Sequence, residues 1–229
     1  MVASAFEFSP VRRKPRPAPS TAEIRKIKIA FLGDAATGKT TLCNLLAERN
    51  GSCLLRHSVN LVSFSSNTVG VDLCSFLVSK EQLAKQTGRP SPYTSAGAGY
   101  QNNNVVFQVN IWDLAGSSKF EEIRSEFYKE SQLVCLVCDC GSRRSQLHLE
   151  DWWRELQDAG YVGPGNKNKV CVVVNKSDLA GDMYHGGGGD AGRGGKEWAV
   201  GKKLPVFDVS AKTGGGLGGL LEYFVQECG

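Results

Sequence analysis

The chain has 229 residues, of which 41% are apolar and 22% are charged. That length can bury one good-sized core with little left over, so we expect one domain with a tail. The net charge of +4 is uneven, because residues 1–28 hold seven Lys or Arg against two Glu. The remainder is nearly neutral, which argues against a broad nucleic-acid-binding surface. Without a signal-peptide-like start or a long apolar stretch, we expect a soluble intracellular chain.

The first 22 residues contain four prolines among basic and small residues. This composition cannot bury enough apolar surface to order itself, so it predicts a flexible basic arm. The favoured interpretation is a solvated tail; the functional alternatives are a nuclear-localisation patch or contact with an anionic membrane. Val2 follows Met1, so the N-myristoylation signal is absent. We therefore expect the protein in the cytoplasm, at the periphery of membranes or in the nucleus.

Eight cysteines lie mostly inside apolar strand or helix patterns. In an intracellular chain we expect reduced thiols that behave as small buried hydrophobes. Cys135, Cys138 and Cys140 invite a zinc interpretation. Alternating strand positions point to opposite faces of a sheet, however, so these three thiolates are not expected to converge on one metal.

The first chemical motif follows an apolar run at residues 27–32 and leads into a helix-like stretch at 41–48. Gly33 and Gly38 let the backbone wrap around an anion, with N–H groups and the helix N-terminus aimed at phosphate oxygens. Lys39 adds a positive charge to the outer phosphates, and the Thr40 hydroxyl is placed to ligate Mg²⁺. Nucleotide contacts are expected from Asp34, Ala35, Ala36, Thr37, Gly38, Lys39, Thr40 and Thr41. The pattern fits ATPases, kinases and GTPases alike.

Apolar runs and helical patterns alternate along the rest of the chain. Strands are expected at 27–32, 73–78, 105–112, 133–138, 170–174 and 205–209, and helices at 41–48, 119–132, 145–159 and 217–226. The runs 73–78 and 105–112 should pair as a hairpin, while residues 50–67 look irregular. The domain should therefore span residues 23–229, with a mobile excursion near 85–104 and a disordered, glycine-rich surface insertion with linker chemistry near 181–201.

This alternation predicts an α/β fold. Its sheet should be mostly parallel and six-stranded, with helices on both faces. Ligand sites of such folds lie at the carboxyl ends of the strands. Asp113 ends one strand and can hold Mg²⁺, and nearby Gly116 can offer a backbone N–H to a terminal phosphate. An Asp followed by a Gly is also an ordinary turn, so this assignment depends on its place after the phosphate loop.

Four residues that follow a buried strand indicate which nucleotide base is bound: Asn175, Lys176, Ser177 and Asp178. The Asp178 carboxylate can accept from both the ring N–H and the exocyclic amine of guanine, donors that adenine lacks. Asn175 can tie this loop to the phosphate loop, and Lys176 can cover one face of the base. After the next strand come Ser210, Ala211 and Lys212: Ala211 offers an N–H to the guanine carbonyl, and Lys212 covers the other face.

With these motifs the chain resembles a Ras-superfamily small GTPase of the Rab-like branch over residues 26–228, apart from the insertions. The resemblance implies an α/β fold of the P-loop NTPase (G domain) type. Residues 120–132 are similar to the Rab-like proteins that in animals carry a C-terminal DnaJ domain, a domain that we do not expect here. The resemblance implies GTP or GDP with Mg²⁺ held by Thr40, Thr68 and Asp113, and a catalytic set of Lys39, Thr68, Gly116 and Ser117. It also implies switch I around Thr68 and switch II from Gly116 onward, both ordered by GTP.

Partners implied by the resemblance are effectors bound through the two switches, an exchange factor and an activating protein. We expect a monomer that acts in intracellular trafficking or signalling. The ending Glu227-Cys228-Gly229 does not support the prenyl anchor typical of Rab proteins. Membrane contact would then need the basic arm or a partner.

The chain departs from the family at two positions near the reacting phosphate. Ser117 stands where the family usually has Gln, and serine is too short to orient the attacking water, so hydrolysis should be slow. Ala35 adds a methyl group where Gly is common and can crowd the transition state. The simpler alternative is that the alignment slips by one residue at Ser117. A non-hydrolysing guanine-nucleotide-binding scaffold is the second function, and a P-loop ATPase or nucleotide kinase is a third that the guanine loop disfavours.

Overall fold

The computed structural model describes residues 23–51, 53–60, 68, 70–88, 105–165, 168–180 and 192–229. The expected basic arm at residues 1–22 lies outside these residues. Within them, no helix is long and apolar enough to cross a membrane.

The described strands form one sheet in the order β2-β3-β4-β1-β5-β6-β7. Their bounds are β1 Glu23–Leu32, β2 Cys53–Asn60, β3 Gly70–Ser79, β4 Val105–Leu114, β5 Leu133–Asp139, β6 Lys169–Asn175 and β7 Val206–Asp208. β1 pairs in parallel with β4 and β5, and β6 pairs in parallel with β5 and β7. β3 runs antiparallel to both β4 and β2. The hairpin expected between β3 and β4 is confirmed, and the sheet is mostly parallel.

The sheet has seven strands, so the expected count of six is wrong. The additional strand is β2, which lies in the segment that the sequence pattern leaves irregular. It pairs antiparallel with β3, from Cys53 opposite Phe76 to Asn60 opposite Gly70. β2 lies at the edge of the sheet, where only one side of a strand is paired and polar residues are tolerated. The sequence of β2 therefore has no regular apolar pattern from which its pairing could be predicted.

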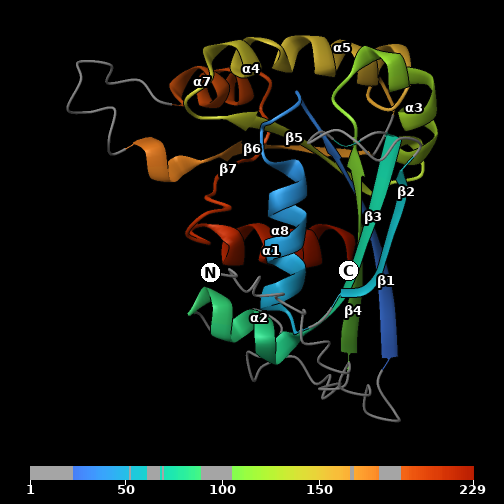
Figure 1. Cartoon of the computed structure of the whole chain (residues 1–229), viewed down its shortest axis with the longest axis vertical. Coiled ribbons are helices and arrows are strands. Elements are labelled where there is room, and N and C mark those ends of the chain that lie inside the picture. The colour runs from blue at the N-terminus through green and yellow to red at the C-terminus, as the bar shows by residue number, and fades with distance from the viewer. Residues whose placement is uncertain are drawn as a thin grey trace, which may run out of the picture.

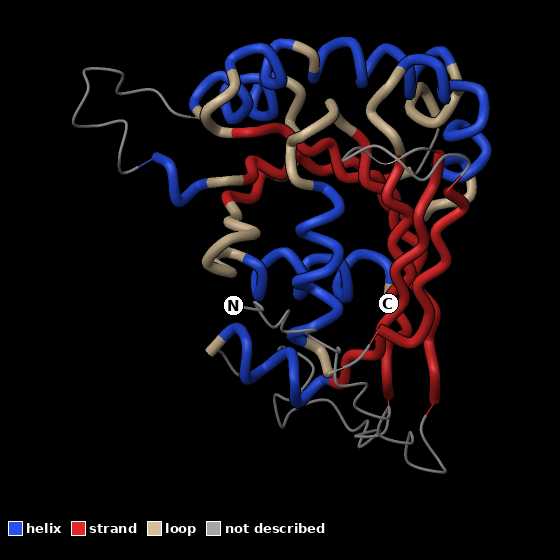
Figure 2. Tube along the Cα trace, in the orientation of Figure 1, coloured by secondary structure: helices blue, strands red, loops and turns tan. Residues whose placement is uncertain are grey.

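Helices cover both faces of the curved sheet (Figures 1 and 2). The helices are α1 Lys39–Arg49, α2 Lys80–Thr87, α3 Glu121–Lys129, α4 Arg143–Leu147, α5 Leu149–Asp158, α7 Arg193–Gly201 and α8 Leu217–Cys228, with single 3-10 turns at Ser118–Phe120 and Ser177–Leu179. α1, α2 and α8 pack their buried apolar residues on one face, while α3, α5 and α7 pack on the other. Two core layers thus enclose a central group of fully buried strands.

The two expected insertions are partly helical. α2 begins with a capping box between Ser79 and Gln82, and its Leu83 is buried. Residues 89–104 of the first insertion lie outside the described residues. In the second, residues 181–191 lie outside them, but 193–201 form α7, so an unstructured segment over the whole of 181–201 is wrong. Gly195 packs against the Cys138 sulfur, where an added Cβ would stand 3.0 Å away. Here glycine serves close helix-to-strand packing rather than linker flexibility.

The cysteines behave as expected of small buried hydrophobes. Of the seven whose side chains are described, all are free thiols, and only Cys228 is not buried. Cys135 lies in the core layer under α1 and α8, whereas Cys138 and Cys140 lie in the opposite layer. In the described part of the chain no cluster of three or more His, Cys, Asp or Glu side chains could hold a metal ion.

Candidate functional site

The site lies where the carboxyl ends of β1, β4, β5 and β6 meet at one edge of the sheet, next to the start of α1. The loop after β1 depends on two glycines with positive φ, 144° at Gly33 and 89° at Gly38. A Cβ on Gly33 would stand 2.1 Å from the Val137 carbonyl oxygen, and one on Gly38 would stand 2.5 Å from Asn175 Nδ2. Both positions therefore require glycine. α1 starts at Lys39 with no side-chain cap, which leaves its first N–H groups directed at the loop.

Lys39 is a buried cation, with only 5% of its surface exposed. Its Nζ donates at 2.8 Å to each of the carbonyl oxygens of Gly33 and Asp34, so the side chain folds back across the loop. Burial lowers the pKa of the Lys39 ammonium, and the carboxylates of Asp113 and Asp34 oppose that shift. An anion in the loop would supply the counter-charge that the protein provides only in part.

Three predicted metal ligands converge although they come from distant parts of the sequence. Thr40 Oγ1 lies 3.0 Å from Thr68 Oγ1 and donates to Asp113 Oδ2, and Thr68 Oγ1 donates to the same oxygen at 3.2 Å. Asp113 is 2% exposed, and burial raises the pKa of its carboxyl group while the Thr40 hydroxyl opposes the shift. Its Oδ1 is buried without a hydrogen-bond partner among the described residues. Hydroxyl and carboxylate oxygens with an unpaired buried acceptor fit Mg²⁺.

Gly116 lies against the phosphate loop. A Cβ on Gly116 would stand 2.5 Å from the Ala35 nitrogen and 2.6 Å from the Gly33 carbonyl oxygen, so no larger residue fits there without movement. Ser117 follows with an exposed side chain, and Ala35 and Ala36 are exposed on the opposing loop. Ala36 takes the left-handed conformation, with φ 64°. The conformational strain in this loop is therefore at Ala36, next to the alanine that the sequence singled out.

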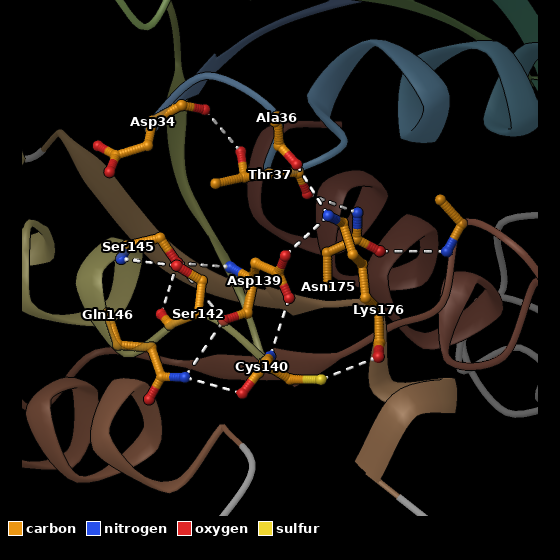
Figure 3. Close-up of polar contacts among 12 residues, drawn as sticks. Asp34, Ala36, Thr37, Asp139, Cys140, Ser142, Ser145, Gln146, Asn175 and Lys176 are labelled. Carbon is orange, nitrogen blue, oxygen red and sulfur yellow. Dashed lines mark hydrogen bonds and ion pairs between the residues drawn. The ribbon is translucent and has the colours of Figure 1, made fainter. Parts of the chain in front are cut away.

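Asn175 joins the loop after β6 directly to the phosphate loop (Figure 3). It is fully buried; its Nδ2 donates to the Thr37 carbonyl oxygen at 2.9 Å, and its Oδ1 accepts the Ala211 N–H at 3.1 Å. Lys176 Nζ donates to the Ala36 carbonyl oxygen at 2.9 Å and lies 2.7 Å from Asp139 Oδ2. The two predicted loops are thus in contact, as a shared nucleotide pocket requires.

The other residues that the sequence assigns to base recognition form hydrogen bonds and an ion pair with one another. Ser210 Oγ donates to Asp178 Oδ1 at 2.5 Å and accepts the N–H of Lys212 at 3.2 Å. That hydroxyl lowers the pKa of the Asp178 carboxyl group. Lys212 Nζ stands 3.8 Å from Asp178 Oδ2 on a mostly exposed side chain. The Ala211 N–H, assigned from sequence to the guanine carbonyl, donates to Asn175 in this structure, so binding a base there would mean sharing or exchanging that bond.

Asp34, Thr37 and Thr41 complete the predicted contacts around the loop. Thr37 is buried and its Oγ1 donates to the Asp34 carbonyl oxygen at 2.9 Å, whereas Thr41 is exposed on α1. The Asp34 carboxylate faces away from the loop, pairing with His148 Nδ1 at 2.7 Å and accepting from Trp152 Nε1 at 2.9 Å. Sequence inspection missed these partners because they lie more than a hundred residues from Asp34.

Asp139 was also missed as the partner of Lys176. It is the last residue of the buried strand β5. A polar residue at the carboxyl end of a buried parallel strand is a usable signal, and it could have been found by the reasoning that selected Asp113.

A family model described as "Ras of Complex, Roc, domain of DAPkinase" matches residues 91–178. Together with the mostly parallel sheet and the phosphate-loop geometry, this match fits an α/β P-loop GTPase fold.

Among curated proteins, the chain is 29% identical over 218 residues to mouse DnaJ homolog subfamily C member 27, covering 94% of this chain and 63% of that protein. The human protein of that name is 28% identical over 200 residues, covering 87% of this chain and 60% of the relative. Small GTPase LIP1 of Arabidopsis thaliana is 26% identical over 207 residues, which cover 83% of this chain and 55% of that protein. The chain thus spans about three fifths of the length of the first two relatives. The chain is thus similar to proteins described as a Ras of Complex domain, a DnaJ homolog and a small GTPase.

Proposed function

We propose that this chain is a guanine-nucleotide switch of the Rab-like branch that binds GTP or GDP with Mg²⁺ and hydrolyses GTP slowly. One observation carries the proposal: Asn175 Nδ2 donates to the Thr37 carbonyl oxygen at 2.9 Å. This bond brings a loop suited to guanine within hydrogen-bond reach of a loop suited to phosphates. Neither loop alone would distinguish a guanine-nucleotide site from other P-loop sites.

In this proposal the phosphate side is served by the backbone and by Lys39. N–H groups of residues 34–41 and the start of α1 face the phosphates, and the Lys39 ammonium exchanges its loop carbonyls for phosphate oxygens. Thr40, Thr68 and Asp113 would hold Mg²⁺, which neutralises charge on the outer phosphates when it is bound. The Thr68 hydroxyl would take part only with a third phosphate, and Gly116 would offer its N–H to that group.

The base side would select guanine through Asp178. Ser210 holds one oxygen of this carboxylate and lowers the pKa of the group. An ionised carboxylate accepts two hydrogen bonds from guanine and repels the acceptor-rich edge of adenine. Lys176 and Lys212 would flank the base with their aliphatic stems.

Catalysis would be weak because Ser117 replaces the side chain that usually orients water. A second candidate, a guanine-nucleotide-binding scaffold without turnover, is favoured by the same residue. The loop carbonyl of Ser117 is also held by Arg124 Nη1 at 2.6 Å, which limits how far Ser117 can approach the third phosphate.

Regulation and location follow from the same proposal. Effectors would bind around Thr68 and from Gly116 onward, with an exchange factor and an activating protein controlling the cycle in trafficking or signalling. The similarity to DnaJ homolog subfamily C member 27 supports the branch assignment together with residues 120–132. We propose a cytoplasmic monomer, with the basic arm at residues 1–22 as the candidate contact with a membrane surface or nuclear import.

The test begins with the nucleotide released from purified protein by heat, which should be a guanosine phosphate. GTP should then outcompete ATP for the emptied protein. In Asp178→Asn, two hydrogen bonds to a charged acceptor are lost, so GTP affinity should fall about 100- to 10,000-fold. The same variant should gain affinity for xanthosine nucleotides, whose base offers the complementary acceptor.

Asp158→Asn, an exposed Asp on α5, is the matched control and should bind GTP as the unaltered chain does. Unchanged GTP affinity in Asp178→Asn would overturn the assignment of the base site.

Single-turnover hydrolysis separates the switch from the scaffold. If the loop is otherwise competent, Ser117→Gln should hydrolyse bound GTP faster than the unaltered chain, because glutamine reaches the attacking water. The release rate of GDP serves as the control and should not change. Hydrolysis absent from both proteins, with or without cell extract as a source of activating protein, would favour the scaffold.

A further inference from the structure

Arg124 on α3 is a buried cation next to the loop that contains Gly116. It is 2% exposed, and its guanidinium forms a two-point ion pair with Glu155 on α5, with Nε 2.7 Å from Oε1 and Nη2 bonded to Oε2. Its Nη1 donates to the carbonyl oxygens of Ser117 at 2.6 Å and Ala115 at 3.3 Å. The planar guanidinium therefore binds the chain on both sides of Gly116 while α5 holds it in place.

The same guanidinium lies over the indole of Trp152, with Cζ 4.7 Å from a ring centroid. The Trp152 ring nitrogen donates to the Asp34 carboxylate at 2.9 Å. Asp34 belongs to the phosphate loop, and its carbonyl oxygen accepts from Lys39. One helix, α5, thus anchors the phosphate loop through Trp152 and the Gly116 loop through Arg124.

We propose that Arg124 is a positioning residue that sets the Gly116 N–H for the third phosphate of a bound nucleoside triphosphate, and this rests on the function proposed above. Gly116 packs too closely on the phosphate loop to tolerate even a Cβ, so a small displacement of its peptide changes the distance to a phosphate oxygen. The other backbone bonds nearby are Ala115 N–H to the Gly70 carbonyl oxygen and Phe120 N–H to the Ser117 carbonyl oxygen. Arg124 is the side chain that links the carbonyls on both sides of Gly116.

A change at Arg124 should therefore affect nucleoside triphosphates and diphosphates differently. The Gly116 N–H would contact only the third phosphate, so disturbing Arg124 should weaken binding of a triphosphate and leave the diphosphate unaffected. Arg124→Lys keeps a charge opposite Glu155, but one ammonium cannot reproduce the fork that binds the carboxylate and two carbonyls together. A purely structural ion pair would lower thermal stability and change release of both nucleotides to the same extent.

The experiment measures release of fluorescent GDP and of a non-hydrolysable fluorescent GTP analogue from the full chain in excess Mg²⁺. We expect Arg124→Lys to speed analogue release about 2- to 10-fold relative to GDP release, the effect of one weakened hydrogen bond. Arg154→Lys is the control, since Arg154 is exposed on α5, the helix that carries Glu155, and it should leave both rates unchanged. If Arg124→Lys does not fold, the same release rates are measured in Glu155→Gln. This variant keeps Arg124 but weakens the ion pair that holds its guanidinium in place.

Trp152→Phe provides a second arm. Phenylalanine keeps a smaller aromatic face under the guanidinium and loses the N–H bond to Asp34. The phosphate loop contacts both nucleotides, so this variant should speed release of GDP and the analogue by the same factor.

A ratio of the two release rates that stays unchanged in both Arg124→Lys and Glu155→Gln would overturn the inference while leaving the proposed function intact. Failure of the unaltered chain to bind any guanine nucleotide would overturn both. A shift of that ratio in the Arg124 variant, without a shift in Trp152→Phe, supports the assignment.

Discussion

The two halves of the candidate site are held in different ways. On the base side, Asn175 links the phosphate loop to the Ala211 backbone, and it is fully buried. On the triphosphate side, Thr68 and Ser117 are held through side-chain hydroxyls and through the Arg124 guanidinium. The base side is a network of bonds within the folded core, whereas the triphosphate side rests on contacts that a metal or a phosphate can replace.

This difference suits two separate tasks, recognition of the base and sensing of a third phosphate. Base recognition benefits from a loop that keeps its shape with or without ligand, because preorganisation lowers the entropic cost of binding. Sensing a third phosphate requires a loop with alternative partners, because a ligand shifts an equilibrium only through a difference in affinity between two states.

Breaking the base side should have the largest effect. Asn175→Ala leaves the Thr37 carbonyl oxygen and the Ala211 N–H without their partner, so we expect the free energy of unfolding to fall by about 2–5 kcal/mol. Affinities for GDP and GTP should fall together, because both use this loop. Denaturant unfolding and nucleotide titration measure these changes.

Asn168→Ala is the matched control at the other end of β6. Among the described residues that amide donates to the Tyr161 carbonyl oxygen at 2.9 Å, and loss of this bond should cost about 1 kcal/mol without changing nucleotide affinity. If Asn175→Ala behaved like Asn168→Ala, the base side would not have the rigid structural role assigned to it.

Weakening the triphosphate side should have a smaller and more selective effect. Thr68→Ala removes a hydroxyl that lies 3.0 Å from Thr40 Oγ1 and 3.2 Å from Asp113 Oδ2. We expect affinity for a GTP analogue in Mg²⁺ to fall about tenfold, and affinity for GDP to change little. Competition titrations with and without Mg²⁺ measure both.

Thr87→Ala, at the end of α2, should leave both affinities unchanged. An equal loss for GDP and the GTP analogue in Thr68→Ala would contradict a role confined to the third phosphate.

Relieving strain in the phosphate loop should have the smallest effect and the opposite sign. Ala36 has φ 64°, a conformation that costs a residue with a Cβ roughly 1–2 kcal/mol. Ala36→Gly removes this cost but adds entropy to the unfolded chain, so the free energy of unfolding should rise by about 0.5–1 kcal/mol. Ala35→Gly, where φ is not positive, should lower it by a similar amount.

Thermal and denaturant unfolding of the nucleotide-free proteins compare the two glycine variants. If Ala35→Gly stabilised the chain and Ala36→Gly did not, strain at Ala36 would not be a property of the folded loop.

Several features could be predicted because their determinants are local. Gly33 and Gly38 adopt positive φ beside strand and helix patterns, Asp113 is the penultimate residue of β4, and Asn175 ends the buried strand β6. The roles of Ala36 and Lys176 were harder to anticipate. Both have left-handed backbones although neither is glycine, and the bond from Lys176 Nζ to the Ala36 carbonyl oxygen links them.

Other features could not be predicted because their partners are distant in sequence. β2 is a strand through its pairing with β3, and the glycine-containing α7 is a helix through close packing on β5 and β6. Arg124 looks like one more exposed charge in an amphipathic helix until Glu155, 31 residues further on, is brought against it. A buried charge depends on such a partner, since unpaired burial would be too costly.

By itself, the sequence determined six of the seven described strands, the glycines that turn the backbone after β1, and the side chains that we propose distinguish guanine. These depend on backbone dihedrals and on donor and acceptor chemistry, which each residue carries with it. Only the tertiary structure decided the seventh strand, the left-handed Ala36, and the anchoring of the Gly116 loop by Arg124 and α5. Those depend on contacts between distant segments, whose energies exist only once folding has excluded water from between them.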